Sequence, residues 1–272
     1  MLIISALYIY PIKSLAGIAV DTAIVTSRGL QYDRRMVLAD ENNCFLTQRE
    51  HPEMALLQPV ITNTGLYIHH KKNKTAPLFI PHQPTGNDFV KVTIWDDTCE
   101  GQLYSREIND WFSLALGRIC KLVYMPSTTN REVDKRYAQN SEITSFADAY
   151  PMLIIGQSSL DDLNNRLPEP LPMNRFRPNI VFTGGAAFLE DEMREFTING
   201  IRFTGAKPCA RCTITTIDQE TTAQSKEPLR TLATYRFKDN KILFGQNLLH
   251  SGDGALNIGD VIDIKAYQPA AI

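Results

Sequence analysis

The chain has 272 residues, enough for about two average domains. With 43% hydrophobic and 21% charged residues, it has the composition of a soluble globular protein, which excludes a disordered, collagenous or coiled-coil chain. Its 28 Lys and Arg residues nearly balance 30 Asp and Glu residues, so the net charge is only -2. No overall positive field exists to attract nucleic acid or an anionic membrane, and we expect neither as a partner.

The sequence gives no sign of export. Its longest apolar run, residues 1–12, is too short to cross a bilayer, contains Pro11 and lacks the basic start of a signal peptide. The five cysteines do not form a disulfide framework, because three of them are isolated in sequence, and they suit a reducing compartment. We therefore expect a cytoplasmic protein.

The first part of the sequence reads mostly as strands. Turn-forming clusters at residues 40–43 and 62–65 separate apolar segments, and residues 89–95 alternate apolar and polar side chains as a half-buried strand does. These features predict a meander or a barrel over the first hundred residues. A helix follows and is expected to end near Gly117. Four residues share its apolar face: Ile108, Trp111, Phe112 and Ala115.

Residues 127–145 are polar and lose apolar periodicity, which places a domain boundary or a long connecting loop there. Beyond it, residues 195–204 predict a hairpin, because Asn199 and Gly200 can adopt the positive φ angles of a two-residue turn. Residues 261–264 predict a further strand near the end. The expected fold is mainly β with a few short helices, of the α+β class.

Two more short helices are predicted in the second half. The first starts at Ser158 or Ser159, either of which would cap it, and stops before Pro168. The second begins at Pro228, because a proline fits the first helical position. The residues expected to face inward are Leu160, Leu163 and Leu167 in the first helix and Leu229, Leu232 and Ala233 in the second.

The sharpest local feature is a Cys-x-x-Cys pair, Cys209 and Cys212. One such pair supplies half of a tetrahedral zinc site, and no second pair of suitable spacing follows. A dithiol redox pair usually opens a helix, whereas residues 213–217 are β-branched and predict a strand. Two interpretations remain: two small buried side chains, or one thiolate acting as a metal ligand or nucleophile. Lys207 and Arg211 would favour the thiolate by opposite charge.

Basic residues stand in small groups beside turns, at residues 13–14, 33–35, 48–49 and 175–179. Each group can donate several hydrogen bonds to a phosphate or to the polar edge of a ring. The sequence does not say whether they meet in one pocket. It contains neither a dinucleotide-binding glycine pattern nor a phosphate loop, so nicotinamide and nucleotide chemistry are disfavoured.

Eight short segments stand out in order along the chain: 10–17 (YPIKSLAG), 33–34 (DR), 146–151 (FADAYP), 159–164 (SLDDLN), 173–179 (MNRFRPN), 207–212 (KPCARC), 226–229 (KEPL) and 244–247 (FGQN). In order and spacing they resemble the motifs of MOSC-domain proteins, most of all the YcbX-type proteins and the mitochondrial amidoxime reducing component. The resemblance implies an N-terminal MOSC-associated β-barrel domain over residues 1–125 and a MOSC catalytic β-barrel domain over residues 126–272.

The resemblance also implies a molybdenum cofactor, a pyranopterin whose dithiolene holds the metal. Cys212 matches the catalytic cysteine that ligates molybdenum, and Cys209 is its neighbour. Asn247 stands where the mitochondrial proteins carry a tyrosine, although the bacterial branch has asparagine there. The remaining matches to cofactor-binding positions are Lys13, Ser14, Arg34, Asp148, Arg177 and Asn179. Their chemistry agrees, since phosphate needs Lys, Arg and Ser donors and a pterin edge needs Asp and Asn.

The implied activity is reduction of small N-hydroxylated compounds, namely amidoximes, N-hydroxylated bases and hydroxylamines. Electrons are expected from a separate donor protein, such as a ferredoxin or flavodoxin with its reductase, because the sequence has no cysteine-rich cluster motif of its own. The alternative is a sulphur carrier in which Cys212 holds a persulphide for metal–sulphur cluster assembly. A carrier requires an exposed Cys212, whereas an oxidoreductase requires a pocket filled by the pterin.

Overall fold

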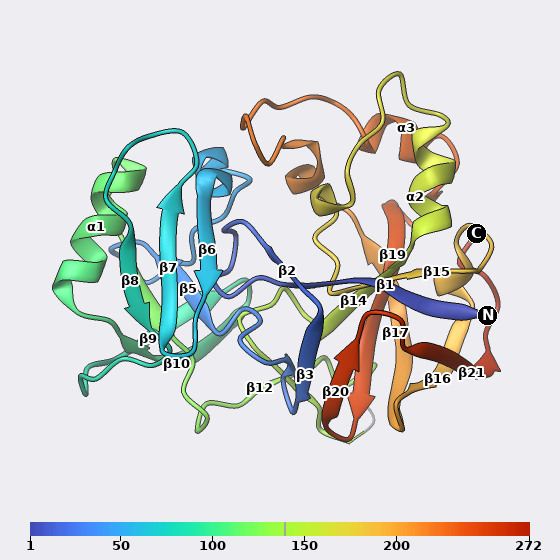
Figure 1. Ribbon diagram of the computed structural model, residues 1–272, viewed down its shortest axis with the longest axis horizontal. Helices are drawn as coiled ribbons and strands as arrows, with labels where there is room; N and C mark the ends of the chain where they lie inside the picture. Colours follow the sequence, from blue (N-terminus) through green and yellow to red (C-terminus); the bar gives the residue numbers. More distant parts are fainter. Residues whose placement is uncertain (139) are drawn as a thin grey trace.

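The computed structural model describes residues 1–138 and 140–272. It has 41% of its residues in strands and 14% in helices, which confirms the expected mainly β fold. Figure 1 shows two lobes, one with the blue-green strands and α1 (Arg106–Leu116), the other with the barrel and both chain ends. Within the described residues, no helix is long and apolar enough to cross a membrane.

The larger lobe is built on a closed seven-stranded barrel. Its strands follow one another as β14 (Met152–Gly156), β15 (Ile180–Thr183), β1 (Leu2–Ile9), β21 (Val261–Tyr267), β16 (Met193–Ile198), β17 (Ile201–Ala210) and β19 (Lys241–Ser251). The ring closes because β14 pairs with β19 as well as with β15. Two short strands pair alongside the ring: β2 (Ile18–Val20) on β1 and β18 (Phe237–Lys238) on β19.

The smaller lobe contains two antiparallel sheets. The four-stranded sheet has the order β5 (Met36–Ala39), β11 (Lys121–Tyr124), β10 (Asp97–Leu103) and β9 (Phe89–Ile94). The three-stranded sheet is a meander of β6 (Leu57–Ile61), β7 (Gly65–His70) and β8 (Leu78–Pro81). Helix α1 packs beside them through Ile108, Phe112 and Leu116. It ends at Gly117, as the sequence predicts, and Gly117 adopts a left-handed conformation there.

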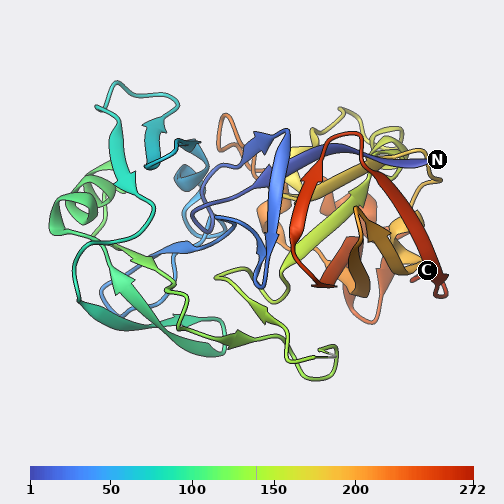
Figure 2. The ribbon, with the colours of Figure 1, turned by 60° about the horizontal axis from the view of Figure 1, so that its bottom comes forward.

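Short elements complete the chain, and Figure 2 shows two of them side by side, the blue strand β3 (Thr22–Thr26) and the red strand β20 (Gly254–Asn257). The short elements are the sheet of β20, β3 and β4 (Gly29–Leu30), the pair β12 (Arg131–Glu132) and β13 (Ile143–Thr144), the helices α2 (Gln157–Asn164) and α3 (Leu229–Ala233), and the 3₁₀ turns η1 (Pro52–Leu56), η2 (Met173–Arg175), η3 (Leu189–Asp191) and η4 (Thr213–Thr216). The polar stretch 127–145 therefore contains a small strand pair rather than loop alone.

Apolar side chains from every barrel strand meet in one buried cluster, which fills the barrel. The predicted hairpin is part of it: Asn199 and Gly200 have φ angles of 49° and 80°, and the arms pair from Ile198 and Ile201 outward. The rings of Phe196 and Phe203 stack across these arms at 5.4 Å. Alternation along the strands thus places one face in the core, as expected for a barrel.

Both predicted helices of the second half begin differently from the expectation. Helix α2 starts at Gln157, and neither serine caps it: Ser158 donates to the Gly185 carbonyl, while Ser159 donates to the buried Glu190 carboxylate. Helix α3 starts at Leu229, with Pro228 at the cap position before it. Leu232 is buried as predicted, whereas Leu229 is only partly buried and Ala233 is exposed.

The predicted strand at residues 213–217 is wrong. Residues Thr213–Thr216 form η4, and Cys212 precedes it as the cap residue. The turn forms because Thr215 and Thr216 donate side-chain hydrogen bonds to carbonyls three residues back, which satisfies backbone groups that a strand would pair across a sheet. Since a helical turn and not a strand follows Cys212, the local secondary structure does not exclude a dithiol redox pair.

The barrel draws on both ends of the chain. Strand β1 lies between β15 and β21, so the first nine residues complete a ring whose other strands all lie beyond residue 151. The chain then leaves for the smaller lobe and returns through β12 and β13. We keep the division at residues 1–125 and 126–272 as a proposal, with β1 crossing from the first part into the second.

One buried carboxyl gives the fold a testable pH dependence. Glu190 is fully buried, and desolvation raises its pKa from 4.5 to about 7 although Ser159 donates to it. A raised folded pKa means that the native state binds the proton more tightly, so this group contributes stability at low pH that is lost as pH rises toward 7. We expect Glu190→Gln to gain up to about 3 kcal/mol over the wild type at pH 8 but less than about 1 kcal/mol at pH 5, because the carboxyl of the unfolded chain begins to ionise at its ordinary pKa of 4.5.

Thermal unfolding of both proteins at the two pH values measures this difference. The exposed Glu195, on the outer face of β16, supplies the control Glu195→Gln, which should change stability at neither pH. An equal effect of Glu190→Gln at pH 5 and pH 8 would contradict the account, since a packing change alone does not depend on pH.

Candidate functional site

All eight site residues expected from the sequence line one cavity. Its empty volume is about 800 Å³, part of it open to solvent. The residues come from both lobes and from segments far apart in sequence: Lys13, Ser14, Arg34, Asp148, Arg177, Asn179, Cys212 and Asn247. The structure therefore shows the convergence that the sequence leaves open, while the roles of these residues in cofactor binding remain a proposal.

Two guanidinium groups meet on one buried tyrosine at one part of this cavity. The Cζ atoms of Arg34 and Arg177 lie 4.2 and 4.3 Å from the centre of the Tyr10 ring. Tyr10 is itself fixed, because its amide donates to Asp33 and its hydroxyl donates to the Pro178 carbonyl at 3.0 Å. An aromatic face stabilises a cation at this distance and holds both arginines in place.

The two arginines differ in their other partners. Arg34 donates to the Asp33 carboxylate at 2.7 Å, to the Asn179 side chain and to the Arg177 carbonyl. Arg177 is only 7% exposed, yet no described residue accepts a hydrogen bond from its guanidinium. Burial, with the charge of Arg34 adding to it, lowers the pKa of Arg177 to about 10. A buried cation without an acceptor is costly, so this group fits an anionic ligand.

The backbone around these residues is unusual. Ser14, Arg34 and Arg177 have φ angles of 67°, 48° and 55°, in the left-handed region that residues other than glycine seldom occupy. Such conformations cost free energy and concentrate at functional sites, where the surrounding structure holds them. The hydroxyl of Ser14 also has no hydrogen-bond partner among the described residues. It remains available to a ligand.

A lysine–aspartate pair forms a second part of the wall. The Lys13 Nζ atom lies 2.5 Å from Asp148 Oδ1, and the Trp95 indole donates to the same oxygen at 3.1 Å. Desolvation opposes ionisation of Asp148, but the Lys13 ammonium and these hydrogen bonds outweigh it and hold the pKa of Asp148 below its usual range. Desolvation also lowers the pKa of Lys13, against the attraction of Asp148. The pair is therefore a fixed donor and acceptor at the cavity wall.

The two asparagines are engaged with the protein itself. Asn179 accepts from Arg34 and from the Leu153 amide, and it donates to the Tyr8 carbonyl at 3.2 Å. Asn247, on β19, donates to the Lys207 carbonyl at 3.2 Å. Asn179 thus holds Arg34 and the start of β14 together, while the Asn247 side-chain oxygen stays available.

The cysteines lie half-buried in the cavity wall, each beside an arginine. Cys212 Sγ is 3.8 Å from Arg49 Nη1, whereas Cys209 Sγ is 3.1 Å from Arg211 Nη1. The expectation that Lys207 and Arg211 act on one reactive thiolate needs correction. Arg211 contacts Cys209 rather than Cys212, and the Lys207 ammonium lies over the rings of Tyr137 and Tyr150, 4.7 and 5.2 Å from their centres.

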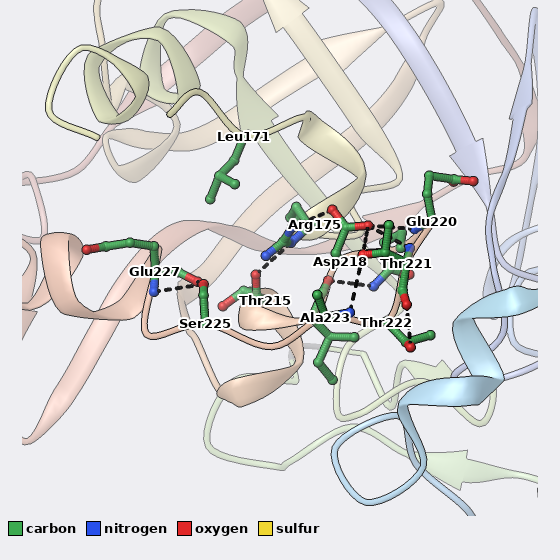
Figure 3. A network of polar contacts seen from close by, with 12 residues as sticks. Leu171, Arg175, Thr215, Asp218, Glu220, Thr221, Thr222, Ala223, Ser225 and Glu227 are labelled. Carbon is green, nitrogen blue, oxygen red and sulfur yellow. Dashed lines mark hydrogen bonds and ion pairs between the residues drawn. The ribbon is translucent and has the colours of Figure 1, made fainter. Parts of the chain in front are cut away.

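The segment after Cys212 is held rigidly (Figure 3). Arg175 donates to the Thr215 carbonyl at 3.0 Å and to the Asp218 carboxylate at 3.2 Å. Asp218 in turn accepts from the amide and hydroxyl of Thr221 and from the amide of Glu220. This network fixes η4 and hence the position of Cys212 in the wall.

Sequence reasoning missed one residue that lines the cavity, Arg49, and two rings that hold lining residues in place, Tyr10 and Trp95. Tyr10 belongs to the first motif but looks like an ordinary core residue. Gly17 packs directly against the Tyr10 ring, since a Cβ added at Gly17 would come within 2.4 Å of that ring. Arg49 belongs to one of the basic groups, so it could have been included. Nothing in the sequence places Trp95 near Asp148, 53 residues away.

The donor set of the cavity fits a ligand with two chemically different ends. Lys13, Arg34 and Arg177 supply cationic donors for an anionic group, and Ser14 adds a hydroxyl. The thiol of Cys212 is of the kind that binds a soft metal such as molybdenum. A phosphate-bearing pterin with a sulphur-bound metal has both of these ends.

Two protein-family models and several known proteins match this chain. A model of the MOSC N-terminal beta barrel domain matches residues 1–119, and a model of the MOSC domain matches residues 142–263. Mitochondrial amidoxime reducing component 2 of Macaca fascicularis is 32% identical over 278 residues, which cover 95% of this chain and 82% of that protein. Mitochondrial amidoxime-reducing component 1 of Mus musculus is 29% identical, with 95% and 81% covered.

A second kind of relative is longer. Molybdenum cofactor sulfurase of Oryza sativa subsp. japonica is 32% identical over 261 residues, which cover 89% of this chain but only 32% of the sulfurase. The chain therefore spans about a third of the length of that relative. The two domain matches in this order, with a relative of this identity and coverage, show that the chain belongs to the MOSC-domain family, with a MOSC N-terminal β-barrel domain ahead of its MOSC domain.

Proposed function

We propose that this protein is a molybdenum-cofactor-dependent oxidoreductase that reduces small N-hydroxylated compounds with electrons from a separate redox protein. One observation supports the proposal most. The wall of a single cavity contains Cys212 together with Arg177, whose guanidinium has no hydrogen-bond acceptor among the described residues, and the cationic Lys13 and Arg34. Relatives that match nearly the whole chain are named amidoxime reducing components, which supports the choice of substrate class.

In this proposal the residues divide into two groups by chemistry. Arg34, Arg177, Lys13 and Ser14 bind the anionic end of the cofactor, while Asp148 and the asparagines face the polar edge of its ring. Cys212 supplies the protein's sulphur ligand to the metal. When bound, the cofactor supplies the two-electron redox chemistry, and the protein fixes its orientation and access.

The overall reaction balances as follows for an amidoxime: the substrate, two electrons and two protons give an amidine and water. The N–O bond breaks, nitrogen is reduced, and the separate electron carrier is oxidised. The chain's own residues orient the reactants. Because Lys13 keeps Asp148 ionised, that carboxylate accepts hydrogen bonds at the cavity wall throughout and does not itself carry a proton at neutral pH.

The test is benzamidoxime reduction by protein made in a host that synthesises the cofactor, with chemically reduced viologen as the electron donor. We expect stoichiometric benzamidine for every two electrons consumed. The proposed activity would be contradicted by a protein that contains molybdenum but reduces neither benzamidoxime nor a hydroxylamine nor an N-hydroxylated base.

We further predict that the purified protein cannot use NADH or NADPH alone. The sequence has no dinucleotide-binding glycine pattern and no four-cysteine cluster motif to pass single electrons. NADH oxidation with an amidoxime should therefore require an added ferredoxin or flavodoxin with its reductase, and it should fall as salt rises, since weak redox encounters depend on charge. Rapid NADH oxidation by the isolated chain would contradict this expectation.

A second candidate function is sulphur transfer through a Cys212 persulphide. It is supported by the similarity to molybdenum cofactor sulfurase over 89% of this chain. The cavity argues for the oxidoreductase instead, because Cys212 is half-buried in its wall beside Arg49 and not on an open surface. Mass spectrometry of the intact protein decides: a carrier adds one sulphur atom to Cys212 and holds little molybdenum.

A further inference from the structure

The walls of the cavity carry far more positive than negative charge. Asp148 is the carboxylate among its lining residues, and it already forms an ion pair with Lys13. The cationic lining residues are Lys13, Arg34, Arg49, Arg177 and Arg211. If Lys13, Arg34 and Arg177 meet the anionic end of a cofactor, Arg49 and Arg211 remain beside the cysteines with no hydrogen bond or ion pair to a carboxylate among the described residues, although the charge of Arg49 helps to lower the pKa of Asp148.

Arg49 is the better placed of the two to meet a small molecule. Arg211 is tied to Cys209 and to the Phe176 carbonyl at 2.7 Å. Arg49 has one side-chain contact to a polar atom, the Cys212 sulphur at 3.8 Å. Its guanidinium otherwise lies on the ring of Trp95, with Cζ 4.2 Å from the ring centre. Several of its N–H groups are therefore free to donate next to the site where Cys212 would bind the metal.

Trp95 is held in a way that fixes Arg49. It lies at the tip of the β9–β10 hairpin with a φ angle of 56°, an uncommon conformation for a bulky residue. Its indole donates to Asp148, and its ring contacts Phe45 at 5.1 Å. Lys13 in turn packs over Phe45 at 5.3 Å. The hairpin tip is thus fastened to the cavity wall, and Trp95 gives Arg49 a rigid platform.

We propose that Arg49, positioned by Trp95, selects substrates by charge, so that N-hydroxylated compounds bearing an anionic group are preferred over cationic ones. The inference rests on the proposed reductase function and adds its substrate class. A planar guanidinium with free donors binds a carboxylate or a similar anion in fixed geometry. A cation placed there meets like charge from Arg49 and Arg211 and loses its hydration without a partner.

The test compares three benzamidoximes that differ only in the para group: carboxylate, hydrogen and trimethylammonium. For the wild type we expect kcat/KM to be at least about tenfold higher for the carboxylate than for the trimethylammonium compound. Arg49→Gln should remove most of this ratio, and Arg49→Lys should keep part of it because the charge remains. Trp95→Leu should reduce the ratio as well, since Arg49 then loses its platform.

Two further measurements make the outcome decisive. The control Arg106→Gln changes an arginine whose side chain is 93% exposed on α1 and should leave the ratio unchanged. Calorimetric binding of 4-carboxybenzamidine, which is not reduced, should weaken about tenfold in Arg49→Gln without any turnover. The molybdenum content of Arg49→Gln and of Arg106→Gln should equal that of the wild type.

The possible results separate the inference from the function it rests on. Equal kcat/KM for the three compounds, or a ratio unchanged in Arg49→Gln, would overturn the charge selection while leaving the reductase intact. Loss of molybdenum from Arg49→Gln would also overturn it, because Arg49 would then hold the cofactor. If no compound is reduced but 4-carboxybenzamidine binding depends on Arg49, the reductase function fails and the anion preference stands.

Discussion

Cys212→Ser is expected to lose N-reductive turnover completely, whereas Cys209→Ser keeps a substantial part of it. A serine hydroxyl is a poor ligand for a soft metal and resists deprotonation, so the metal site is lost in the first variant. Cys209 packs against the apolar cluster outside the barrel and contacts Arg211, which a serine of similar size can still do. Its replacement should therefore act only through packing.

The measurement is benzamidoxime reduction with reduced viologen, together with the molybdenum content of each variant. Cys209→Ser is the matched control, because it makes the same chemical change three residues away in the same wall. If Cys209→Ser were inactive and Cys212→Ser active, the metal ligand would be Cys209 and not Cys212. Normal turnover in both variants would show that neither sulphur reaches the metal.

The second large effect concerns the buried arginines. Removal of one partner of a charge-assisted hydrogen bond costs about 1.5 to 3 kcal/mol, or roughly ten- to a hundredfold in affinity. We expect Arg34→Met and Arg177→Met to purify with little pterin and molybdenum. Elemental analysis measures the molybdenum content, and fluorescence measures the pterin content. Full occupancy in both variants would show that the arginines do not hold the cofactor.

The structure predicts different effects of Arg177→Met and Arg34→Met on the stability of the protein without cofactor. Arg177 is a buried cation without an acceptor, and burial lowers its pKa, so its charge opposes folding and its removal should not lower the unfolding temperature. Arg34 neutralises Asp33, which is 1% exposed, so its removal should destabilise the apo protein by about 3 to 5 kcal/mol. Equal losses of stability would contradict this distinction.

Local features of the fold could be predicted because their causes are local. The hairpin around Asn199 and Gly200 follows from the turn chemistry of two adjacent residues, and both have the expected positive φ angles. Helix α1 follows from apolar spacing and ends at Gly117. The 3₁₀ turn η4 has a local cause that sequence reasoning overlooked, the hydrogen bonds of Thr215 and Thr216 to carbonyls three residues back, and a non-local one, the hydrogen bond from Arg175 to the Thr215 carbonyl.

The site was predictable in its residues but not in its arrangement. The motifs that resemble the MOSC-domain family contain the eight residues expected in the cavity. The contacts that position them run across the fold, such as Tyr10 with Arg177 and Trp95 with Asp148. Closure of the barrel by β1 is equally non-local, since its neighbours β15 and β21 lie far along the chain. Such contacts depend on the packed fold and not on neighbouring residues in sequence.

The molybdenum and pterin content of the purified protein decides whether it is a molybdenum-cofactor enzyme. After expression in a host that makes the cofactor, we expect roughly one molybdenum and one pterin per chain, since one cysteine ligates one metal. Both should be lost in Arg177→Met while the protein stays folded. A folded wild-type protein that carries no molybdenum and instead holds an extra sulphur atom on Cys212 would contradict the account.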